Sequence, residues 1–350
     1  MKDESKVVGI KDVAKVAKVA LATVDRVIHN RTGVSEKTKN KVLKVIEELG
    51  YQPNIMASNL SKGKQFVFGA LLPKASSKAS YWEFPVKGIL KAQKELQQYR
   101  IKVEPFLYDQ KDSAEIRKQI LKIINSDIDG LVLTAKFAKE IDILLQDCKE
   151  KNRPFVFIDS NIKEKEPICS IQQPLYESGE LAGQLFNYCF KEGEILILHF
   201  KDTMDSGDII DLKVKGLINY LKETASTIST KKVVITNFSE ENIKIEVDKI
   251  LKENPNIKGI FTPNSKIGYI ARYLSKRKSK KIVLTGYDLL NENKKFIDKG
   301  VIDFLICQRP KQQGYQAVNK LFEHLVLRKE VEKEILIPLD VLTSKNYKYY

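Results

Sequence analysis

The sequence lacks the features that mark membrane and secreted proteins. It contains no apolar run of about eighteen residues, so we expect no transmembrane helix. The opening residues Met1 to Glu4 lead into no apolar stretch, so we expect no secretory signal. The four cysteines form no CxxC pair, which argues against a zinc site and against a disulfide framework. These absences predict a cytoplasmic protein with no membrane association and with reduced thiols in its core.

The signatures of common enzyme classes are also absent. The chain has no GxGxxG motif for a dinucleotide and no GxxxxGK motif followed by Ser or Thr for a nucleotide phosphate. Its three histidines, His29, His199 and His324, are dispersed, and no nucleophile can be assigned to His199 at the end of a predicted strand. We therefore expect no enzyme, no cofactor and no catalytic or metal site. An enzyme on an α/β scaffold is the least favoured alternative.

Positive charge is present in excess. The chain has 350 residues and a formal net charge of +15, from 60 Lys and Arg against 45 Asp and Glu. Such an excess is typical of proteins that bind a polyanion, either nucleic acid or an anionic membrane. Only nine of the basic residues are Arg, so a generally Lys-rich surface is the alternative explanation. At 43% hydrophobic residues, the length predicts two or three structural units.

The first sixty residues predict a small helical domain. Apolar residues repeat with helical spacing over 10–18, 21–29 and 35–49, and the tight turn between the first two predicts a helix-turn-helix. Gly50 ends the third helix, and Pro53 follows it. A short, weakly helical piece and a Gly/Ser/Lys stretch come next. The predicted domains are a headpiece over 1–53, a hinge helix and linker over 54–64, and a larger domain over 65–350.

The larger domain alternates short β-rich runs with amphipathic helices. Continuous apolar strands separated by helices are typical of parallel sheets covered on both faces. So many strands predict two doubly wound α/β lobes, with a seam near 160–175. The predicted strands are Phe66–Leu72, Ile101–Tyr108, Gly130–Thr134, Phe155–Ile158, Ile195–His199, Lys232–Asn237, Gly259–Thr262, Ile282–Tyr287 and Ile302–Cys307.

The N-terminal motifs carry a specific resemblance. They are Ile10-Lys11-Asp12-Val13-Ala14, Ala22-Thr23-Val24-Asp25-Arg26-Val27, Val34-Ser35-Glu36-Lys37-Thr38, Gly50-Tyr51-Gln52-Pro53-Asn54, and Ala57 with Leu60. Their order and spacing resemble the DNA-binding headpiece of the lactose/galactose repressor (LacI/GalR) family. The resemblance implies a periplasmic-binding-protein-like core. It also implies a sequence-specific transcriptional regulator whose operator affinity responds to a sugar or sugar derivative.

The headpiece departs from the family pattern at three positions. The family usually has Gly where this chain has Lys18, and Ser where it has Ala20 and Asp25. An Asp on a helix that faces DNA repels phosphate, yet it can accept a hydrogen bond from cytosine N4. Alternatively, Asp25 orients Arg26 or a neighbouring lysine. The mode of DNA binding therefore follows from the resemblance, whereas the base sequence that is read does not.

The resemblance implies a DNA contact role for each part of the headpiece. The second helix would enter the major groove of a pseudo-palindromic duplex with Leu21, Ala22, Thr23 and Arg26 at base edges. Arg26 can donate to guanine O6 and N7; the alternative is a surface salt bridge with Asp25 or Glu47. His29 and Asn30 are further contact candidates. Phosphate contacts are expected from Ser35, Lys37, Thr38, Lys11 and Asn54.

Residues 54–60 resemble the family's hinge helix. The segment is too short to be helical alone in water and would fold when two copies pair in the minor groove. Leu60 would then insert between base pairs, and the small Ala57 would let the two helices approach. The alternative is that Leu60 packs on the core.

Candidate ligand-binding residues follow the predicted strands, where open α/β sheets bind ligands. By resemblance, Asp288 accepts from ligand hydroxyls, and Asn264 and Gln308 line the same pocket. Lys213 stands in place of an Arg, and Ser265 replaces an Asp, which leaves open a ligand other than the usual neutral sugars. Asp159 and the single Trp, Trp82, complete the candidates. A turn or helix cap is the alternative for each polar residue, and a core or dimer aromatic for Trp82.

A two-fold DNA site calls for a two-fold protein, so we expect a homodimer. The tail from Asp340 to Tyr350 has no apolar heptads, so nothing in it predicts a tetramer-forming coiled coil. The remaining alternative is a small-molecule-binding protein that does not regulate DNA.

Overall fold

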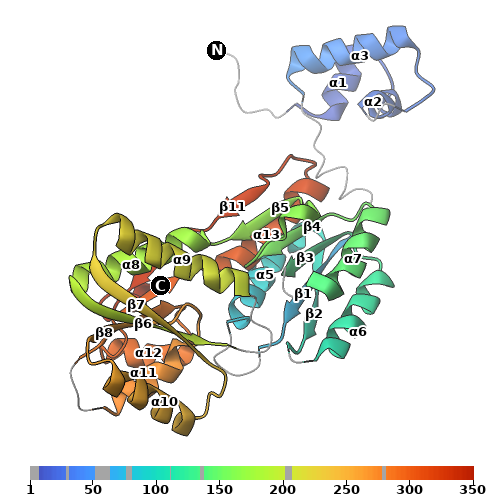
Figure 1. The fold of residues 1–350 in the computed structure, drawn as a ribbon. Helices are drawn as coiled ribbons and strands as arrows, with labels where there is room; N and C mark the ends of the chain where they lie inside the picture. The colour runs from blue at the N-terminus through green and yellow to red at the C-terminus, as the bar shows by residue number, and fades with distance from the viewer. Residues whose placement is uncertain are drawn as a thin grey trace. The chain divides into compact units, whose positions relative to one another are not determined.

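The computed structural model describes residues 8–28, 31–51, 64–75, 81–110, 112–134, 138–201, 207–277 and 281–350. The chain divides into two compact units, Met1–Lys64 and Gln65–Tyr350 (Figure 1). Each unit has its own hydrophobic core, so each is described by itself.

The smaller unit consists of the predicted helices. They are α1 (Ile10–Ala17), α2 (Leu21–Ile28) and α3 (Glu36–Leu49). Val13, Val24 and Val42 are fully buried where the three helices meet. Ser35 caps α3 by accepting a hydrogen bond from the Thr38 backbone N–H. Gly50, at φ 60°, ends the helix in the left-handed conformation that glycine adopts without strain.

The larger unit contains two six-stranded sheets, which confirms the predicted two-lobed α/β fold. The first sheet is parallel throughout, in the order β11-β5-β4-β3-β1-β2; the second has the order β12-β10-β9-β8-β6-β7, and only its edge strand β12 is antiparallel. The first sheet contains β1 (Phe66–Pro73), β2 (Ile101–Tyr108), β3 (Gly130–Thr134), β4 (Phe155–Ile158), β5 (Cys169–Gln172) and β11 (Glu334–Leu336). The second contains β6 (Glu192–Phe200), β7 (Thr227–Ile235), β8 (Ile257–Phe261), β9 (Val283–Tyr287), β10 (Phe304–Cys307) and β12 (Asp340–Leu342).

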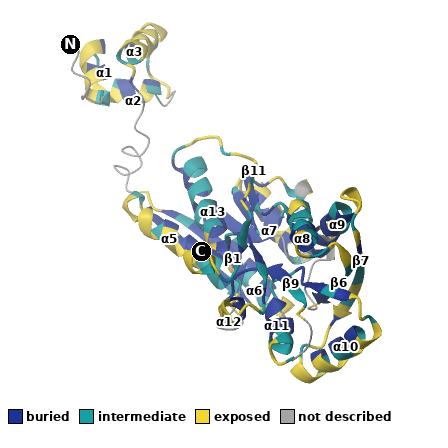
Figure 2. Cartoon of the chain, turned by 90° about the vertical axis from the view of Figure 1, so that its left-hand side faces the viewer, coloured by how far each residue is buried: buried dark blue, intermediate teal, exposed yellow. Residues whose placement is uncertain are grey.

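Helices cover both faces of each sheet, so the central strands are buried, while the edge strands and the outer helix faces are partly exposed (Figure 2). Along β6, Ile195 and Ile197 pack on one face of the sheet, while Leu196 and Leu198 pack on the other. The helices around the first sheet are α5 (Glu83–Glu95), α6 (Ser113–Ile124), α7 (Ala138–Glu150) and α13 (Pro310–Leu325). Those around the second are α8 (Leu175–Cys189), α9 (Gly207–Glu223), α10 (Glu240–Glu253), α11 (Ile267–Ser275) and α12 (Asn291–Asp298).

Several strand predictions need correction. Strands β5, β11 and β12 were not predicted, because they have only three or four residues and no extended apolar run. Strand β7 begins at Thr227 rather than Lys232 and ends at Ile235, since its first half is a polar edge strand. Cys189 is exposed at the end of α8, whereas Cys148, Cys169 and Cys307 are buried thiols as expected.

The chain passes between the lobes at three places. It passes once between β5 and α8, inside the predicted seam, and again between β10 and α13 and between β11 and β12. The predicted seam is therefore one passage of three. Both α13 and β11 belong to the first lobe although they follow the second lobe in the sequence. The two lobes are therefore joined by three separate segments of the chain.

Candidate functional sites

The face of α2 away from the headpiece core carries the predicted base-reading residues. Val24 and Val27 are buried, so Leu21, Ala22 and Arg26 lie exposed, and Leu21 is 44% exposed. Thr23 is half-buried at the edge of this face. In the described part of the chain, Arg26 forms no ion pair, so the predicted alternative of a salt bridge with Asp25 or Glu47 is not observed.

Asp25 pairs with an arginine that the sequence did not suggest. Its Oδ2 lies 3.2 Å from Nη1 of Arg31, and the Arg31 backbone N–H donates to the Arg26 carbonyl at 2.8 Å. Arg31 is thus a partner of Asp25 beyond Arg26 and the lysines that the hypothesis named. Arg31 is the cation held at this end of α2.

The start of α3 presents the predicted phosphate-binding groups. The Ser35 and Thr38 hydroxyls lie 2.9 Å apart, beside the backbone N–H groups of the first turn. Helix N-termini favour anions because these N–H groups have no partner within the helix. The remaining predicted DNA contacts lie outside the described residues; these are His29, Asn30, Asn54, Ala57 and Leu60.

Lys18 ends α1 in the left-handed conformation, with φ 50° and ψ 47°. Its backbone N–H donates to the Lys15 carbonyl at 3.3 Å, and that of Val19 donates to Ala14 at 3.1 Å. Glycine is favoured in such a cap because a Cβ in this conformation costs about 1 kcal/mol. The turn of the helix-turn-helix is thus built here with a side chain that strains it.

In the larger unit, Asp159 and Asp288 occupy equivalent corners of the two lobes. Asp159 directly follows β4 and Asp288 directly follows β9, and their φ angles are 67° and 64°. Each backbone N–H donates to the neighbouring strand, to Ile171 and Ile306 respectively, at 3.1 Å. The two predicted ligand-binding carboxylates are therefore positioned by the same backbone conformation and the same type of hydrogen bond. Non-glycine residues with positive φ are uncommon and often mark functional sites.

Groups from both lobes meet at these corners. Gln308, which follows β10, donates through Nε2 to both Asp288 carboxylate oxygens at 3.3 Å. Burial raises the pKa of the Tyr81 phenol well above its usual value, and the nearby charges of Asp159 and Asp288 raise it further. Tyr81 thus lies within electrostatic reach of one carboxylate from each lobe. Sequence reasoning missed Tyr81 and chose its neighbour Trp82, which is only 4% exposed and packs edge-on against the Tyr81 ring.

The two other predicted ligand residues are engaged with the protein. Lys213 is 4% exposed, and its Nζ lies 3.6 Å from the centre of the Tyr287 ring. Asn264 donates to the Phe200 carbonyl at 3.0 Å and accepts from the Lys266 backbone N–H at 3.2 Å. These bonds favour the turn role for Asn264 that the sequence left as an alternative, since the N-cap of α11 is Lys266.

Other polar side chains at the same strand ends have unused hydrogen-bonding capacity. Gln173 follows β5, Thr262 follows β8 and Gln308 follows β10, and all three residues are buried. Among the residues described, Gln173 Oε1, Thr262 Oγ1 and Gln308 Oε1 have no hydrogen-bond partner. Buried polar atoms of native proteins are nearly always hydrogen-bonded, so this group suits a hydroxyl-bearing ligand.

Gln313 of α13 joins the lobes next to these corners. Its side chain is fully buried; Oε1 accepts from the Asp159 backbone N–H at 2.8 Å, and Nε2 donates to the Gln308 carbonyl at 3.0 Å. Arg309, between them, forms a bidentate pair with Asp340 at 2.6 and 2.7 Å. Its backbone N–H donates to the Tyr350 hydroxyl at 2.9 Å. No sequence signal distinguished these residues, because their partners are distant along the chain.

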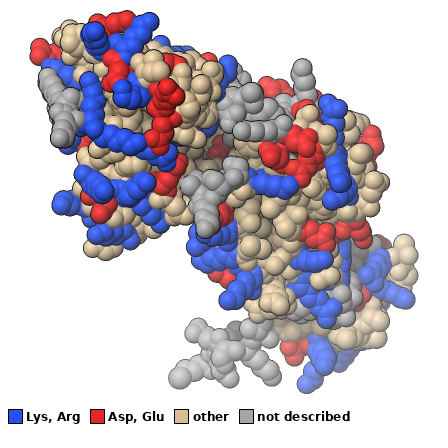
Figure 3. All heavy atoms as spheres, turned by 90° about the horizontal axis from the view of Figure 1, so that it is seen from below, with Lys and Arg blue, Asp and Glu red and all other residues tan. Residues whose placement is uncertain are grey.

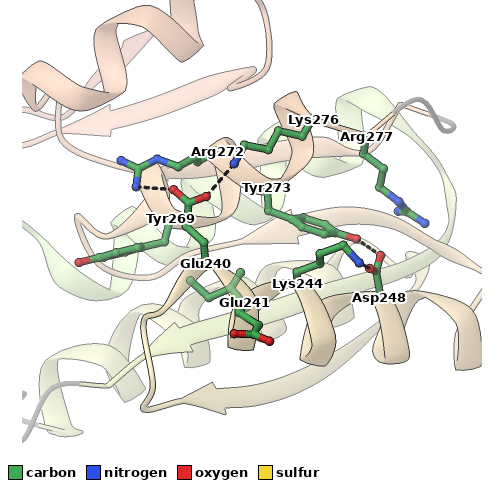
Figure 4. Close-up of a pocket in the computed structure, with 10 residues that line it drawn as sticks. Glu240, Glu241, Lys244, Asp248, Tyr269, Arg272, Tyr273, Lys276 and Arg277 are labelled. Carbon is green, nitrogen blue, oxygen red and sulfur yellow. Dashed lines mark hydrogen bonds and ion pairs between the residues drawn. The ribbon is translucent and has the colours of Figure 1, made fainter.

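A separate groove lies between α10 and α11, and none of the predicted site residues is among the described residues that line it (Figure 4). Its volume is about 640 Å³, and Ile243, Tyr269 and Tyr273 supply its apolar lining. Glu240 on its rim pairs with Arg272 at 3.2 Å and Lys276 at 2.6 Å. On the face drawn in Figure 3, basic and acidic side chains are interspersed, so the net positive charge is not gathered there in one patch.

Two further findings concern the whole described chain. Across the described ranges, no His, Cys, Asp and Glu side chains form a group of three that could hold a metal ion. None of the helices described is long and apolar enough to span a membrane.

Comparison with known proteins matches each unit to a separate family. The family model "Bacterial regulatory proteins, lacI family" matches residues 9–54, and the model "Periplasmic binding protein domain" matches residues 68–329. The chain is 28% identical over 298 residues to the transcriptional regulator MalR of Streptococcus pneumoniae, covering 81% of this chain and 84% of that protein. It is 25% identical to the ribose operon repressor of Halalkalibacterium halodurans over 80% of each chain.

A solved structure agrees with these matches. A putative LacI transcriptional regulator from Bacteroides fragilis superposes with a TM-score of 0.71 at 28% identity, covering 82% of this chain and 100% of that one.

Proposed function

Because the chain belongs to the lacI family of bacterial regulatory proteins and its larger unit to the periplasmic binding protein family, we propose that it switches one operator in response to a small sugar or sugar derivative. The chain is a DNA-binding transcriptional regulator, as its relatives are. The observation that carries the proposal is the exposed face of α2 inside the lacI-family match. We infer that it acts in the cytoplasm on double-stranded DNA and is not an enzyme.

For DNA, we assign base reading to the exposed face of α2 and phosphate binding to the start of α3. Leu21, Ala22, Thr23 and Arg26 would face base edges, and Ser35 and Thr38 would bind phosphate oxygens. We retain residues 54–64 as hinge and linker between a headpiece over 1–53 and a ligand-binding domain over 65–350. In this proposal Asn54, Ala57 and Leu60 contact the minor groove.

For the effector, we assign the two corner carboxylates and their neighbours. Asp159 and Asp288 would each accept from ligand hydroxyls, from opposite lobes, while Gln308 holds the Asp288 carboxylate in place. The buried oxygens of Gln173 and Thr262 add acceptors for further hydroxyl groups. A polyol with donors on both sides matches this arrangement, and the similarity to a ribose operon repressor supports a sugar.

The regulatory mechanism we propose is a change in the angle between the lobes. A ligand that bonds to both lobes favours one angle over others, and it shifts the equilibrium by its difference in affinity. The three chain segments that pass between the lobes would bend when this angle changes. The changed angle would move the two linkers of a dimer and so alter operator affinity.

We propose that the dimer forms through the groove between α10 and α11. Glu241 and Arg277 line it, and in the part of the chain described neither forms an ion pair. A two-fold axis would bring Glu241 of one copy to Arg277 of the other, which satisfies both charges and covers the apolar lining.

A charge exchange tests this dimer. Glu241→Arg or Arg277→Glu alone would place like charges together and weaken dimerisation by about tenfold or more, whereas the double variant would restore it. Sedimentation velocity over a concentration series measures the dissociation constant. Arg117→Glu on α6 is the control and should leave it unchanged. Equal dissociation constants for all four variants would remove the groove from the interface.

The function itself is tested by selecting random duplex DNA on the purified full chain at physiological salt, with and without added metabolite extract. We expect a pseudo-palindromic motif in one condition and a changed yield in the other. Low salt is avoided because non-specific binding then dominates. No enriched motif in either condition would contradict the proposal.

A further inference from the structure

The recognition helix carries a carboxylate where phosphate repulsion should disfavour one. Asp25 lies on α2 with 39% of its side chain exposed, next to the exposed Arg26. Each strand of duplex DNA presents a row of phosphates along the groove that such a helix enters. An unpaired carboxylate there would lower affinity. A nearby positive charge is therefore required if α2 is to bind DNA with Asp25 in this position.

The ion pair with Arg31 provides this positive charge. Nη1 of Arg31 lies 3.2 Å from Asp25 Oδ2, so the pair is neutral as a whole. A guanidinium has five N–H donors, and this contact uses only one edge of the fork. The Arg31 side chain remains 54% exposed, so its other donors face solvent. The same cation can bind the carboxylate and an anion together.

The backbone fixes where Arg31 stands. Its N–H donates to the Arg26 carbonyl at 2.8 Å, which ties the residue to the C-terminal end of α2. Four residues later, Ser35 begins the N-terminal turn of α3, with its hydroxyl 2.9 Å from that of Thr38. Arg31 thus stands on the connection between the helix that reads bases and the helix start that suits phosphate. In a recognition helix the N-terminal residues contact the bases, whereas Asp25 lies in the C-terminal half of α2, on the side of Arg31.

We propose that Arg31 is a phosphate-binding residue of the operator complex and that Asp25 is its positioning residue rather than a base reader. The inference rests on the proposed DNA-binding function. It predicts that Asp25 is tolerated only while Arg31 is present. Removing the arginine alone takes one positive charge away from the Asp25 carboxylate and leaves a net negative charge nearer the phosphates, so its effect should exceed the loss of one contact.

The test compares Arg31→Gln, Asp25→Asn and the double variant in the full chain. The probe is a mixed-sequence duplex of about three helical turns, for which phosphate contacts are the main source of affinity. Arg31→Gln should weaken binding about tenfold and reduce the slope of log affinity against log salt by about one for each headpiece bound. Adding Asp25→Asn should recover most of the lost affinity, because the exposed carboxylate is removed. Arg117→Gln on α6, an exposed arginine of the larger unit, is the matched control and should leave both values unchanged.

Several outcomes would overturn the inference, and they can be told apart. Additive effects of the two substitutions would mean that Asp25 does not act through Arg31. A changed base in the motif selected by Asp25→Asn would make Asp25 a base reader. An unchanged salt slope for Arg31→Gln would remove Arg31 from the phosphates. If the unsubstituted chain binds no duplex at any salt concentration, the proposed function fails, and the inference fails with it.

Discussion

Single residues distinguish this headpiece from its family pattern. Lys18 takes a left-handed conformation that glycine would adopt without strain, and Asp25 replaces a serine on the helix that faces DNA. In the structure Asp25 forms an ion pair with Arg31, whereas the backbone strain at Lys18 remains. Arg26, in contrast, stands exposed and forms no ion pair in the described part of the headpiece. Each of these three residues supports a separate experiment.

Replacing Lys18 with Gly should stabilise the headpiece by about 0.5–1 kcal/mol, because the strain at φ 50° is removed. Amide hydrogen exchange of α1 in the full chain measures this, and we expect slower exchange. Lys15→Gly, in the last helical turn before it, is the control and should have the opposite effect. Equal or faster exchange in Lys18→Gly would show that the turn is not strained.

Replacing Arg26 with Ala should cost about 1–3 kcal/mol of operator binding and relax the preference at one base pair in each half-site. Repeating the duplex selection with the variant measures both effects. Lys37→Ala, at a predicted phosphate contact, should weaken binding without changing the motif. An unchanged motif with Arg26→Ala would mean that this residue reads no base.

At the scale of elements, two pairs of helices cross with their backbones in contact. A Cβ added to Gly88 of α5 would lie 1.9 Å from the Lys311 carbonyl oxygen, and one added to Gly314 of α13 would lie 2.1 Å from that of Pro85. Gly179 of α8 stands in the same way against α9, at 1.9 Å from the Lys213 carbonyl oxygen. Each lobe thus has one crossing that only glycine permits. The crossing in the first lobe also sets the position of α13, which carries Gln313.

Gly314→Ala should therefore force α5 and α13 apart and destabilise the larger unit by about 1–3 kcal/mol or more, because backbone atoms cannot yield as a flexible side chain can. Thermal unfolding of the full chain measures the loss. Lys311→Ala, exposed on the same helix, is the control and should leave the unfolding temperature nearly unchanged. A variant as stable as its parent would contradict the close approach.

At the scale of the whole larger unit, the lobes are joined by a chain of hydrogen-bonded polar groups. Gln313 links the Asp159 backbone N–H of one lobe to the Gln308 carbonyl of the crossover, and Gln308 in turn holds Asp288 of the other lobe. Arg309 in the same crossover is held by Asp340 and Tyr350. The angle between the lobes therefore depends on buried hydrogen bonds as well as on chain connectivity.

Gln313→Leu should broaden the range of lobe angles, because it removes both hydrogen bonds of this side chain, from the Asp159 N–H and to the Gln308 carbonyl. Spin labels at Ile143→Cys and Ile245→Cys, both 60% exposed and on different lobes, would report the distance distribution once Cys189 is replaced by Ser. Gln316→Leu on the same helix is the control, since its Oε1 has no partner within the described chain. The same distribution width in both variants would show that Gln313 does not fix the angle.

Local patterns in the sequence were enough to predict several features of the structure. Apolar spacing gave the three headpiece helices, Ser35 and Gly50 marked the ends of α3, and continuous apolar strands predicted two parallel lobes. The headpiece motifs predicted the mode of DNA binding, and the positions of Asp159 and Asp288 after strands made them ligand candidates. All of these signals act over a few residues, where side-chain periodicity and backbone preference determine structure.

The contacts between groups far apart along the chain became known from the three-dimensional structure. The bond from Asp159 to Gln313 spans 154 residues, and that between Ser178 and Tyr287 spans 109. It also revealed that α13 returns to the first lobe, that Tyr81 lies near both carboxylates, and that strands of three residues complete the sheets. Such contacts depend on how whole helices and strands pack against one another. Packing brings together surfaces of matching shape and polar groups that need hydrogen-bond partners. Neither property produces a periodic pattern in the local sequence.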